Sequence, residues 1–573
     1  MVRSSGLIKA IGLKRVIKKL LKVLLVGSPY FCSQFAFCAP ILSLNPKASA
    51  LGNAVTAENV GVDSSQFNPA TLTQLVVGSE GIFQEFKLIA LPFPDYKIAP
   101  SKPTPDEDPF NDLNVFVNDC QGACLLGDND PRDTPWEPKI ERLAIYVPGY
   151  GEVDFDADLA NFIVAPSLSR AFRSHRTSRF TYATSVYVPI AGGVHLEKEP
   201  WNIRQNTASI GAFGLAPVFA YKLSPTWSVG GGVSFAVAGA KIGFDYRYPG
   251  AFTGAINEIF NVFCPADTQS LLDACGVDSQ TPLNTNEALY HFYFEGKDKL
   301  IWSFNAGVLW EPTPWFSWGL SYKHRSKFKI EGDGGLILTE NLFELIDGAT
   351  NDIPLVDELL FSGAPVEQEF TGIGQLSFIL PTQIDTGVSV QLTGRLKLNI
   401  DYHWRESSLL NKTSLSITEI NEASGEALAP FIFALYTGRI ELGLPQTVAL
   451  DDAPILGLDF RDIGNFAYGL TYQYSEKLTF RSGYQKRRSA FNGETPIGAI
   501  DEIKMLGVGF NYKWDADTEL DVTYVNLSSR KDVAAGESLL TEVYFNPLAL
   551  FAGMHLSTSI EANILQISWA RRI

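Results

Sequence analysis

The residue types best suited to catalysis are scattered through this chain rather than grouped into motifs. The chain contains six histidines, at His175, His195, His291, His324, His403 and His555. None of them belongs to an HExxH motif, whose two histidines lie one helical turn apart and bind zinc. The sequence also has no GxxxxGK[ST] phosphate loop and no GxSxG nucleophile turn. We therefore expect no enzyme activity, no catalytic residue and no cofactor.

Four of the six cysteines form two local pairs. Cys120 and Cys124 lie four residues apart, and Cys264 and Cys275 lie eleven apart. In a secreted chain this spacing predicts two disulfides that staple loops, with free thiols or cross-pairing as alternatives. Neither pair has the neighbouring His or Cys that a zinc site needs, so we predict no metal there. The acidic run at 128–133 could bind Ca²⁺, although such runs are more often solvated loops.

Residues 1–38 have the layout of a secretory signal peptide. Seven basic residues and no acidic ones precede a short apolar stretch, and small residues near its end fit cleavage before Ala39. A membrane anchor is the alternative, but Pro29 interrupts the run well short of the roughly 20 apolar residues that a span needs. Removing seven positive charges from a net charge of −17 leaves about −24. Such an acidic chain is not expected to bind nucleic acid.

From Glu80 onward, apolar and polar residues alternate as in β-strands with two different faces. In residues 396–404, for example, Leu, Leu, Ile, Tyr and Trp share one face, and Lys, Asn, Asp and His share the other. Many segments exceed the mean strand length of roughly 5 to 6 residues, and their apolar faces often end in aromatic residues, as in membrane barrels. No stretch after the signal is long enough for a spanning helix. We therefore predict an all-β transmembrane barrel with its apolar face outward, and keep a soluble sandwich as the alternative.

The segments number fourteen, an even number as in bacterial outer-membrane barrels. Their centres lie near residues 84, 166, 184, 214, 233, 304, 321, 384, 400, 468, 481, 508, 521 and 564. Short connections predict turns at the inner side, and the long ones predict external loops at about 92–160, 245–295, 333–370, 407–455 and 528–557. The predicted organisation is a signal peptide at 1–38, a separate N-terminal segment at 39–75 and the barrel at 76–573.

The segment before the first predicted strand consists almost entirely of small and polar residues. It contains ALGNA at 50–54 and FNPA at 67–70. These two sequences, followed by fourteen strands, resemble the FadL-type outer-membrane channels. The similarity extends to three further stretches, at 305–332, 378–391 and 478–485.

The resemblance implies that residues 39–75 fold back into the barrel lumen as a hatch. Small side chains suit a crowded interior of this kind. Pro69 fixes its own φ and Asn68 can hydrogen-bond locally, so Asn68, Pro69 and Ala70 would form a tight turn in the hatch. The alternative is a simple surface turn.

The FadL family takes up long-chain fatty acids and, in its TodX-like branch, monoaromatic hydrocarbons. The resemblance therefore implies passive uptake of a hydrophobic molecule across the outer membrane of a Gram-negative bacterium. A long-chain fatty acid is the main expectation, and a neutral aromatic hydrocarbon is the alternative. The implied partners are this ligand, outer-membrane lipid and lipopolysaccharide, and the barrel assembly machinery. The large loops favour a rival of another class, a surface adhesin or structural barrel, whereas a lipase would need a Ser–His motif that is missing.

In the family, the third and fourth external loops capture the ligand. Both corresponding loops here carry apolar residues at helical spacings of three and four. These residues are Ile256, Ile259, Phe260 and Phe263 in the third loop, and Leu342, Leu345 and Ile346 in the fourth. Two amphipathic helices would either leave an apolar groove between them or bury these faces on each other.

Two basic residues are candidates for binding a fatty-acid carboxylate, because an unpaired charge in an apolar pocket is costly. The family's lumenal lysine beyond the ninth strand corresponds in position to Lys412. Arg405 is expected to point inward by alternation with Lys397 and His403. A merely solvated Lys412 is the alternative. The family's arginine beyond the fifth strand has no clear counterpart here, which leaves the head group of the ligand open.

The third strand of the family is kinked and opens a lateral exit. The matching stretch at 181–194 contains Pro189, Gly192 and Gly193. Proline removes a ladder donor and glycine loosens a strand, so we predict a bulge that would serve lateral release. An irregular strand end is the alternative. Trp569, near the C-terminus, is expected to be the interfacial aromatic residue of the last strand.

Overall fold

The structure is a computed structural model. It describes residues 45–92, 95–104, 142–156, 162–175, 178–195, 207–246, 290–340, 343, 368–418, 460–491, 502–537 and 554–573. The predicted signal peptide, the four paired cysteines, the acidic run at 128–133 and the seven predicted loop residues from Ile256 to Ile346 lie outside these ranges. In the part of the chain that is described, no helix is both long and apolar enough to cross a membrane.

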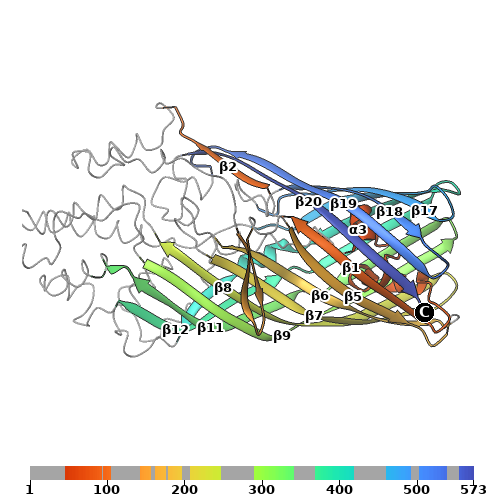
Figure 1. Ribbon diagram of the computed structural model, residues 1–573, viewed down its shortest axis with the longest axis horizontal. Helices are drawn as coiled ribbons and strands as arrows, with labels where there is room; N and C mark the ends of the chain where they lie inside the picture. Colours follow the sequence, from red (N-terminus) through yellow and green to blue (C-terminus); the bar gives the residue numbers. More distant parts are fainter. Residues whose placement is uncertain are drawn as a thin grey trace, which may run out of the picture.

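Fourteen antiparallel strands close into a barrel, as the sequence predicted (Figure 1). β1 (Ile82–Pro92) pairs with β5 (Phe162–Phe172) on one side and with β20 (His555–Arg572) on the other, which closes the cylinder. Eight strands follow the chain order: β6 (Phe180–His195), β7 (Thr207–Lys222), β8 (Trp227–Tyr246), β9 (Tyr290–Thr313), β16 (Ile463–Gln473), β17 (Leu478–Arg487), β18 (Ile503–Lys513) and β19 (Thr518–Val533).

The three strands between β9 and β16 are each built from two segments. They are β10 (Phe316–Lys323) with β11 (Ser326–Leu338), β12 (Glu369–Leu380) with β13 (Gln383–Gln391), and β14 (Leu396–Arg405) with β15 (Ser414–Thr418). A 3-10 helix, η7 (Ser407–Lys412), separates the last two segments. β13 pairs with β10 and β14, and β14 in turn pairs with β16.

The alternating sequence places apolar side chains on the outside of the barrel. On β8, Val233, Phe235 and Val237 are exposed, whereas Ser228 and Ala238 on the opposite face are buried. Ser228 Oγ accepts a hydrogen bond from the hydroxyl of Thr73, which precedes the first strand and lies inside the barrel, so the buried face is the lumenal one. An exposed apolar outer face is what a barrel in lipid requires.

The connections differ sharply between the two ends of the barrel. Short turns join β7 to β8, β9 to β10, β13 to β14, β16 to β17 and β18 to β19 at the end where the C-terminus lies (Figure 1). The strand ends that flank the long connections lie at the other end. Several strands extend into ranges expected to be loop. β9 begins at Tyr290, β11 ends at Leu338, β19 ends at Val533, and β15 lies entirely within 407–455.

The range expected to be the first external loop contains additional strands. β2 (Asp95–Ser101) pairs with β20, and β3 (Arg142–Val147) forms a hairpin with β4 (Gly151–Asp156). β3 also pairs with the end of β6 and crosses β7 and β8 (Figure 1). Tyr146 packs on Gly239, which follows the outward-facing Val237 by two residues. The hairpin therefore lies on the outer face of the wall.

Residues 45–75, here called the plug, fill the lumen near the short-turn end. They form four short helices: α3 (Pro46–Ala50), η2 (Gly61–Asp63), α4 (Ser64–Phe67) and η3 (Pro69–Gln74). Asn45 caps α3 by accepting a hydrogen bond from the backbone N–H of Ala48. Nearly every plug residue is buried, so the segment packs against the wall rather than lying in open solvent.

Candidate functional site

The predicted Asn68–Pro69–Ala70 turn lies fully buried inside the barrel. The Nδ2 of Asn68 donates to the carbonyl oxygen of Thr56 at 2.7 Å and to that of Val308 on β9 at 3.0 Å. Its Oδ1 accepts from the N–H of Ala70 at 3.1 Å and so caps η3. Asn68 thus holds two plug segments together and joins them to the wall.

Glycines line the wall where the plug touches it. A Cβ atom at Gly307 would lie 2.0 Å from Asn68 Oδ1, and one at Gly319 would lie 2.1 Å from the carbonyl oxygen of Thr56. A Cβ at Gly230 would lie 2.6 Å from the carbonyl carbon of Pro69. At these positions the wall backbone lies so close to the plug that only glycine, which has no Cβ, can be accommodated.

One buried ionic network ties the plug to β1. The ammonium of Lys87 pairs with the carboxylate of Asp63 and lies 4.0 Å from that of Glu85. Glu85 accepts hydrogen bonds from the N–H of Val62 and from the hydroxyl of Ser568 on β20. Removing one member would leave a buried charge without its partner, which makes the network strongly dependent on the plug's position.

A second network joins the plug to β14. Glu58 lies 3.2 Å from the Lys47 ammonium and 3.5 Å from that of Lys397, and it accepts a 2.6 Å hydrogen bond from Asn399. Burial alone would raise the pKa of Glu58, but the two ammonium groups and Asn399 outweigh it and hold that pKa well below its usual range. Burial lowers the pKa of Lys47, and the carboxylate of Glu58 opposes this effect.

The barrel wall opens between β5 and β6. All of β5, from Phe162 to Phe172, pairs with β1, but within the described residues β5 pairs with β6 only through Arg170–Phe172. Farther along, β6 bulges, because Val188 and Pro189 together lie opposite a single residue of β7. The predicted kink residues Pro189, Gly192 and Gly193 therefore lie where the edge of β6 has separated from β5.

A cavity of about 160 Å³ lies inside this opening. Ser167 of β5 and residues 186–189 of β6 form one side of it, and plug residues Gln66 and Phe67 form another. The far side includes residues from β10, β12, β13 and β14. The cavity therefore connects the plug with the edges of the two separated strands.

Two cations line the cavity. Arg405, which sequence alternation placed inward, donates to the carboxylate of Asp385 at 2.5 Å, and His403 Nδ1 lies 2.8 Å from the same oxygen. The ammonium of Lys323 lies 5.0 Å from the centre of the Tyr187 ring, a cation–π contact. Arg405 is neutralised by an acidic partner, whereas Lys323 is held by an aromatic face beside the wall opening.

Lys412 occupies a different place from the one expected of a head-group ligand. It is exposed, lies at the end of η7 and is not among the residues that line the cavity. Its neighbour Asn411 instead exchanges two hydrogen bonds with the backbone of Phe460, which fixes η7 to the adjoining connection.

Sequence reasoning missed Lys323 as a cavity residue. The alternation along β10 could have identified it, because Lys323 shares one strand face with Ser317, Gly319 and Ser321. The structure shows that these three residues contact the plug, so this face is lumenal. It also missed the Lys87–Asp63 pair, because two residues 24 apart on different elements show no local pattern.

A second, larger space of about 830 Å³ lies on the other side of the plug, toward the short turns. Its lining is strongly polar and includes Gln74, Lys222, Glu311 and Arg395. This vestibule, as we call it, suits water rather than an apolar ligand.

Comparison with known proteins agrees with this architecture. Residues 137–570 match the family described as outer membrane protein transport protein (OMPP1/FadL/TodX). A long-chain fatty acid transport protein of Escherichia coli O6:H1 is 24% identical over 306 residues, which cover 53% of this chain and 56% of that protein. The chain thus matches little more than half the length of this relative.

Two solved structures share the fold. A FadL homologue of Pseudomonas aeruginosa has a TM-score of 0.56 and 13% identity, covering 92% of this chain and 98% of that one. The toluene transporter TbuX of Ralstonia pickettii has a TM-score of 0.52 and 14% identity, covering 93% and 99%. The closed fourteen-strand barrel and the match across most of the chain show that this protein belongs to the OMPP1/FadL/TodX family of outer-membrane transport proteins.

Proposed function

We propose that this protein is a passive channel for hydrophobic molecules, with long-chain fatty acids as its main substrates. The third and fourth external loops capture the ligand, the cavity above the plug receives it, and the opening between β5 and β6 releases it sideways into the membrane. The plug acts as a hatch that closes the lumen beneath the cavity. Catalysis is no part of this proposal.

The observation that carries the proposal is the joint position of the wall opening and the cavity. Ser167 and residues 186–189 belong to the two separated strands and also line the cavity. A ligand in the cavity therefore has a route through the wall without passing the plug. The polar vestibule on the other side would be a poor path for an apolar molecule, because moving apolar surface into water is unfavourable.

The cations of the cavity support a fatty acid as the substrate. Lys323 and Arg405 both line it, and among the described residues an acidic side chain pairs with Arg405 but not with Lys323. A carboxylate could pair with Lys323 while its chain extends into the wall opening. The similarity to a long-chain fatty acid transport protein agrees with this assignment.

The size of the cavity supports monoaromatic hydrocarbons as a second candidate class. A volume of about 160 Å³ resembles the cavity of roughly 150 Å³ that holds benzene in a protein interior, and is smaller than the usual range of about 300–1,000 Å³ for ligand pockets. A long-chain acid would have to extend beyond this space or displace the plug. The chain shares its fold with the toluene transporter TbuX.

Equilibrium binding of a fluorescent long-chain fatty acid to the purified barrel in detergent tests the proposal. Unlabelled oleate and toluene serve as competitors. Lys323→Gln should weaken fatty-acid binding, and Lys477→Gln, in an exposed turn at the other end, should leave it unchanged. Competition by toluene alone would assign neutral hydrocarbons instead, and absence of binding would favour the adhesin or structural barrel.

A further inference from the structure

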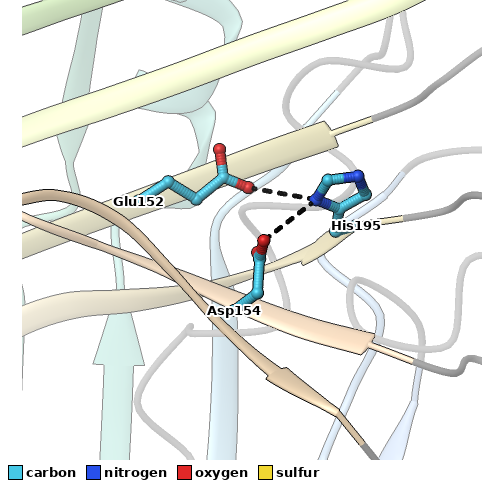
Figure 2. A group of neighbouring side chains, drawn as sticks. All are labelled: Glu152, Asp154 and His195. Atoms are coloured by element: carbon cyan, nitrogen blue, oxygen red, sulfur yellow. Dashed lines mark ion pairs between the residues drawn. The ribbon is translucent and has the colours of Figure 1, made fainter.

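Three side chains with metal-binding atoms meet at the β3–β4 hairpin (Figure 2). None of them lines the cavity. Glu152 and Asp154 lie two residues apart on β4 and so project from the same face of that strand. His195 lies at the end of β6. Its Nδ1 is 3.2 Å from Asp154 Oδ2 and 3.8 Å from Glu152 Oε1, and one ligand atom from each residue lies within 4.8 Å of the others.

These distances fit a tetrahedral metal site. Zinc binds imidazole nitrogen and carboxylate oxygen at about 2.0–2.2 Å, so two ligands of a tetrahedron lie roughly 3.3–3.6 Å apart. The two measured distances bracket this value. A set of one imidazole and two carboxylates suits zinc-like transition metals, whereas Ca²⁺ and Mg²⁺ prefer oxygen ligands alone.

The direction of the imidazole is compatible with a metal ion bound by all three side chains. Figure 2 shows His195 Nδ1 pointing between the two carboxylates. An Nδ1 that lies beside two carboxylate oxygens either donates a hydrogen bond to one of them or shares a metal ion with both.

Residues of the barrel wall hold Glu152 in the orientation that a ligand needs. The hydroxyl of Thr207 on β7 donates to Glu152 Oε1 at 2.5 Å, and the ammonium of Lys241 on β8 lies 3.2 Å from Oε2. Glu152 is almost completely buried, with 6% of its side chain exposed. Hydrogen bonds to metal-binding carboxylates commonly fix their orientation and tune affinity.

We propose that Glu152, Asp154 and His195 form a binding site for a divalent transition metal of the zinc class. The metal would link β4 to the end of β6, at the position where β3 pairs with β6 through Arg142 and His195. It would thereby fasten the β3–β4 hairpin to the outer wall. This site is independent of the transport proposal, because none of its ligands lines the cavity.

Metal titration of the full chain, without a histidine tag, tests the site. The protein in detergent is treated with EDTA and then titrated with Co²⁺ in excess Mg²⁺, which occupies oxygen-only sites. We expect one Co²⁺ per chain with the strong visible absorption of tetrahedral cobalt, and displacement of that ion by Zn²⁺. His195→Gln and Glu152→Gln should abolish this signal, and Thr207→Val should weaken affinity about tenfold.

His175→Gln is the matched control, since His175 lies in an exposed turn at the other end of the barrel. Heat-modifiable migration on a gel shows whether each variant is folded, and Asp154→Asn, at a half-exposed position, replaces any variant that fails. Loss of the cobalt signal in the ligand variants alone supports the site. Equal binding by His195→Gln and wild type, or no binding by wild type, overturns it and leaves a histidine that only hydrogen-bonds to the two carboxylates.

Discussion

Two regions of the lumen are built in opposite ways. Around the plug, the wall carries glycine at Gly230, Gly307 and Gly319, and the two backbones touch. Around the cavity, the wall itself separates, because β5 and β6 share only a short stretch of pairing in the described residues. Tight contact closes the first region, and a missing strand contact opens the second.

The two edges of β5 show where the opening originates. β5 pairs with β1 over its full length even though it contains Pro166, which lies opposite Leu88. Its other edge loses its neighbour because β6 bulges at Val188 and Pro189. A proline alone therefore does not open a strand pair. An inserted residue that bends the neighbouring strand does.

Deleting Pro189 should have the largest effect on transport. The deletion leaves Val188 opposite Phe213, restores regular pairing between β6 and β7, and lets β6 approach β5. We expect fatty-acid uptake by cells to fall at least about tenfold, which corresponds to roughly 1.4 kcal/mol in the barrier.

Pro166→Ala is the control for this deletion, since it alters a proline in the closed seam. It should leave uptake near the wild-type rate. Normal uptake by the Pro189 deletion, with the protein present in the outer membrane at normal levels, would contradict a route through this opening.

Asp385→Asn should show whether the ligand binds Arg405 in the cavity. Asp385 neutralises Arg405 in the cavity, so the substitution frees a guanidinium for the ligand. A charge-assisted hydrogen bond contributes about 1.5–3 kcal/mol, so oleate affinity should rise roughly tenfold while toluene affinity stays constant. Competition binding measures both values, and weaker oleate binding would show that the ligand does not use Arg405.

Asn68→Ala should loosen the closed region without opening the wall. Asn68 is fully buried and makes hydrogen bonds to Thr56, Val308 and Ala70. Orphaning these backbone groups should cost about 1–3 kcal/mol. Hydrogen exchange should speed up in residues 45–75 but not in the barrel strands. The control is Asn526→Ala, at a half-buried position on β19 away from the plug, and equal exchange in both variants would mean that Asn68 does not secure the plug.

The smallest effect should come from pH acting on Glu58. Its pKa is lower in the folded protein than in the unfolded chain, so its contribution to plug stability is present above about pH 4.5 and is lost as pH falls through the lower folded pKa. Plug hydrogen exchange, corrected for its intrinsic pH dependence, should be constant from about pH 7 to 5 and faster in strong acid. Glu58→Gln should remove this dependence, and an unchanged acid response in that variant would assign it to other groups.

The sequence predicted those features that depend on local pattern. Period-two alternation identified the barrel and placed Arg405 inward, and Asn68–Pro69 marked a turn that is now found inside the lumen. It did not predict the Asp385 partner of Arg405 or the hairpin in the first connection. Both depend on contacts between separate strands, which alternation within one strand does not specify. Lys412 was selected from a family position and lies outside the cavity.

Photo-crosslinking with a diazirine fatty acid would show directly where the ligand leaves the barrel. The ligand is bound to the wild-type barrel in lipid bilayers, irradiated and located by mass spectrometry. Lateral release predicts labelling at Ser167, Val186 and Val188, the edges of the wall opening. Labelling instead at vestibule residues such as Gln74 and Arg395 would show that the ligand passes the plug, and would contradict lateral release.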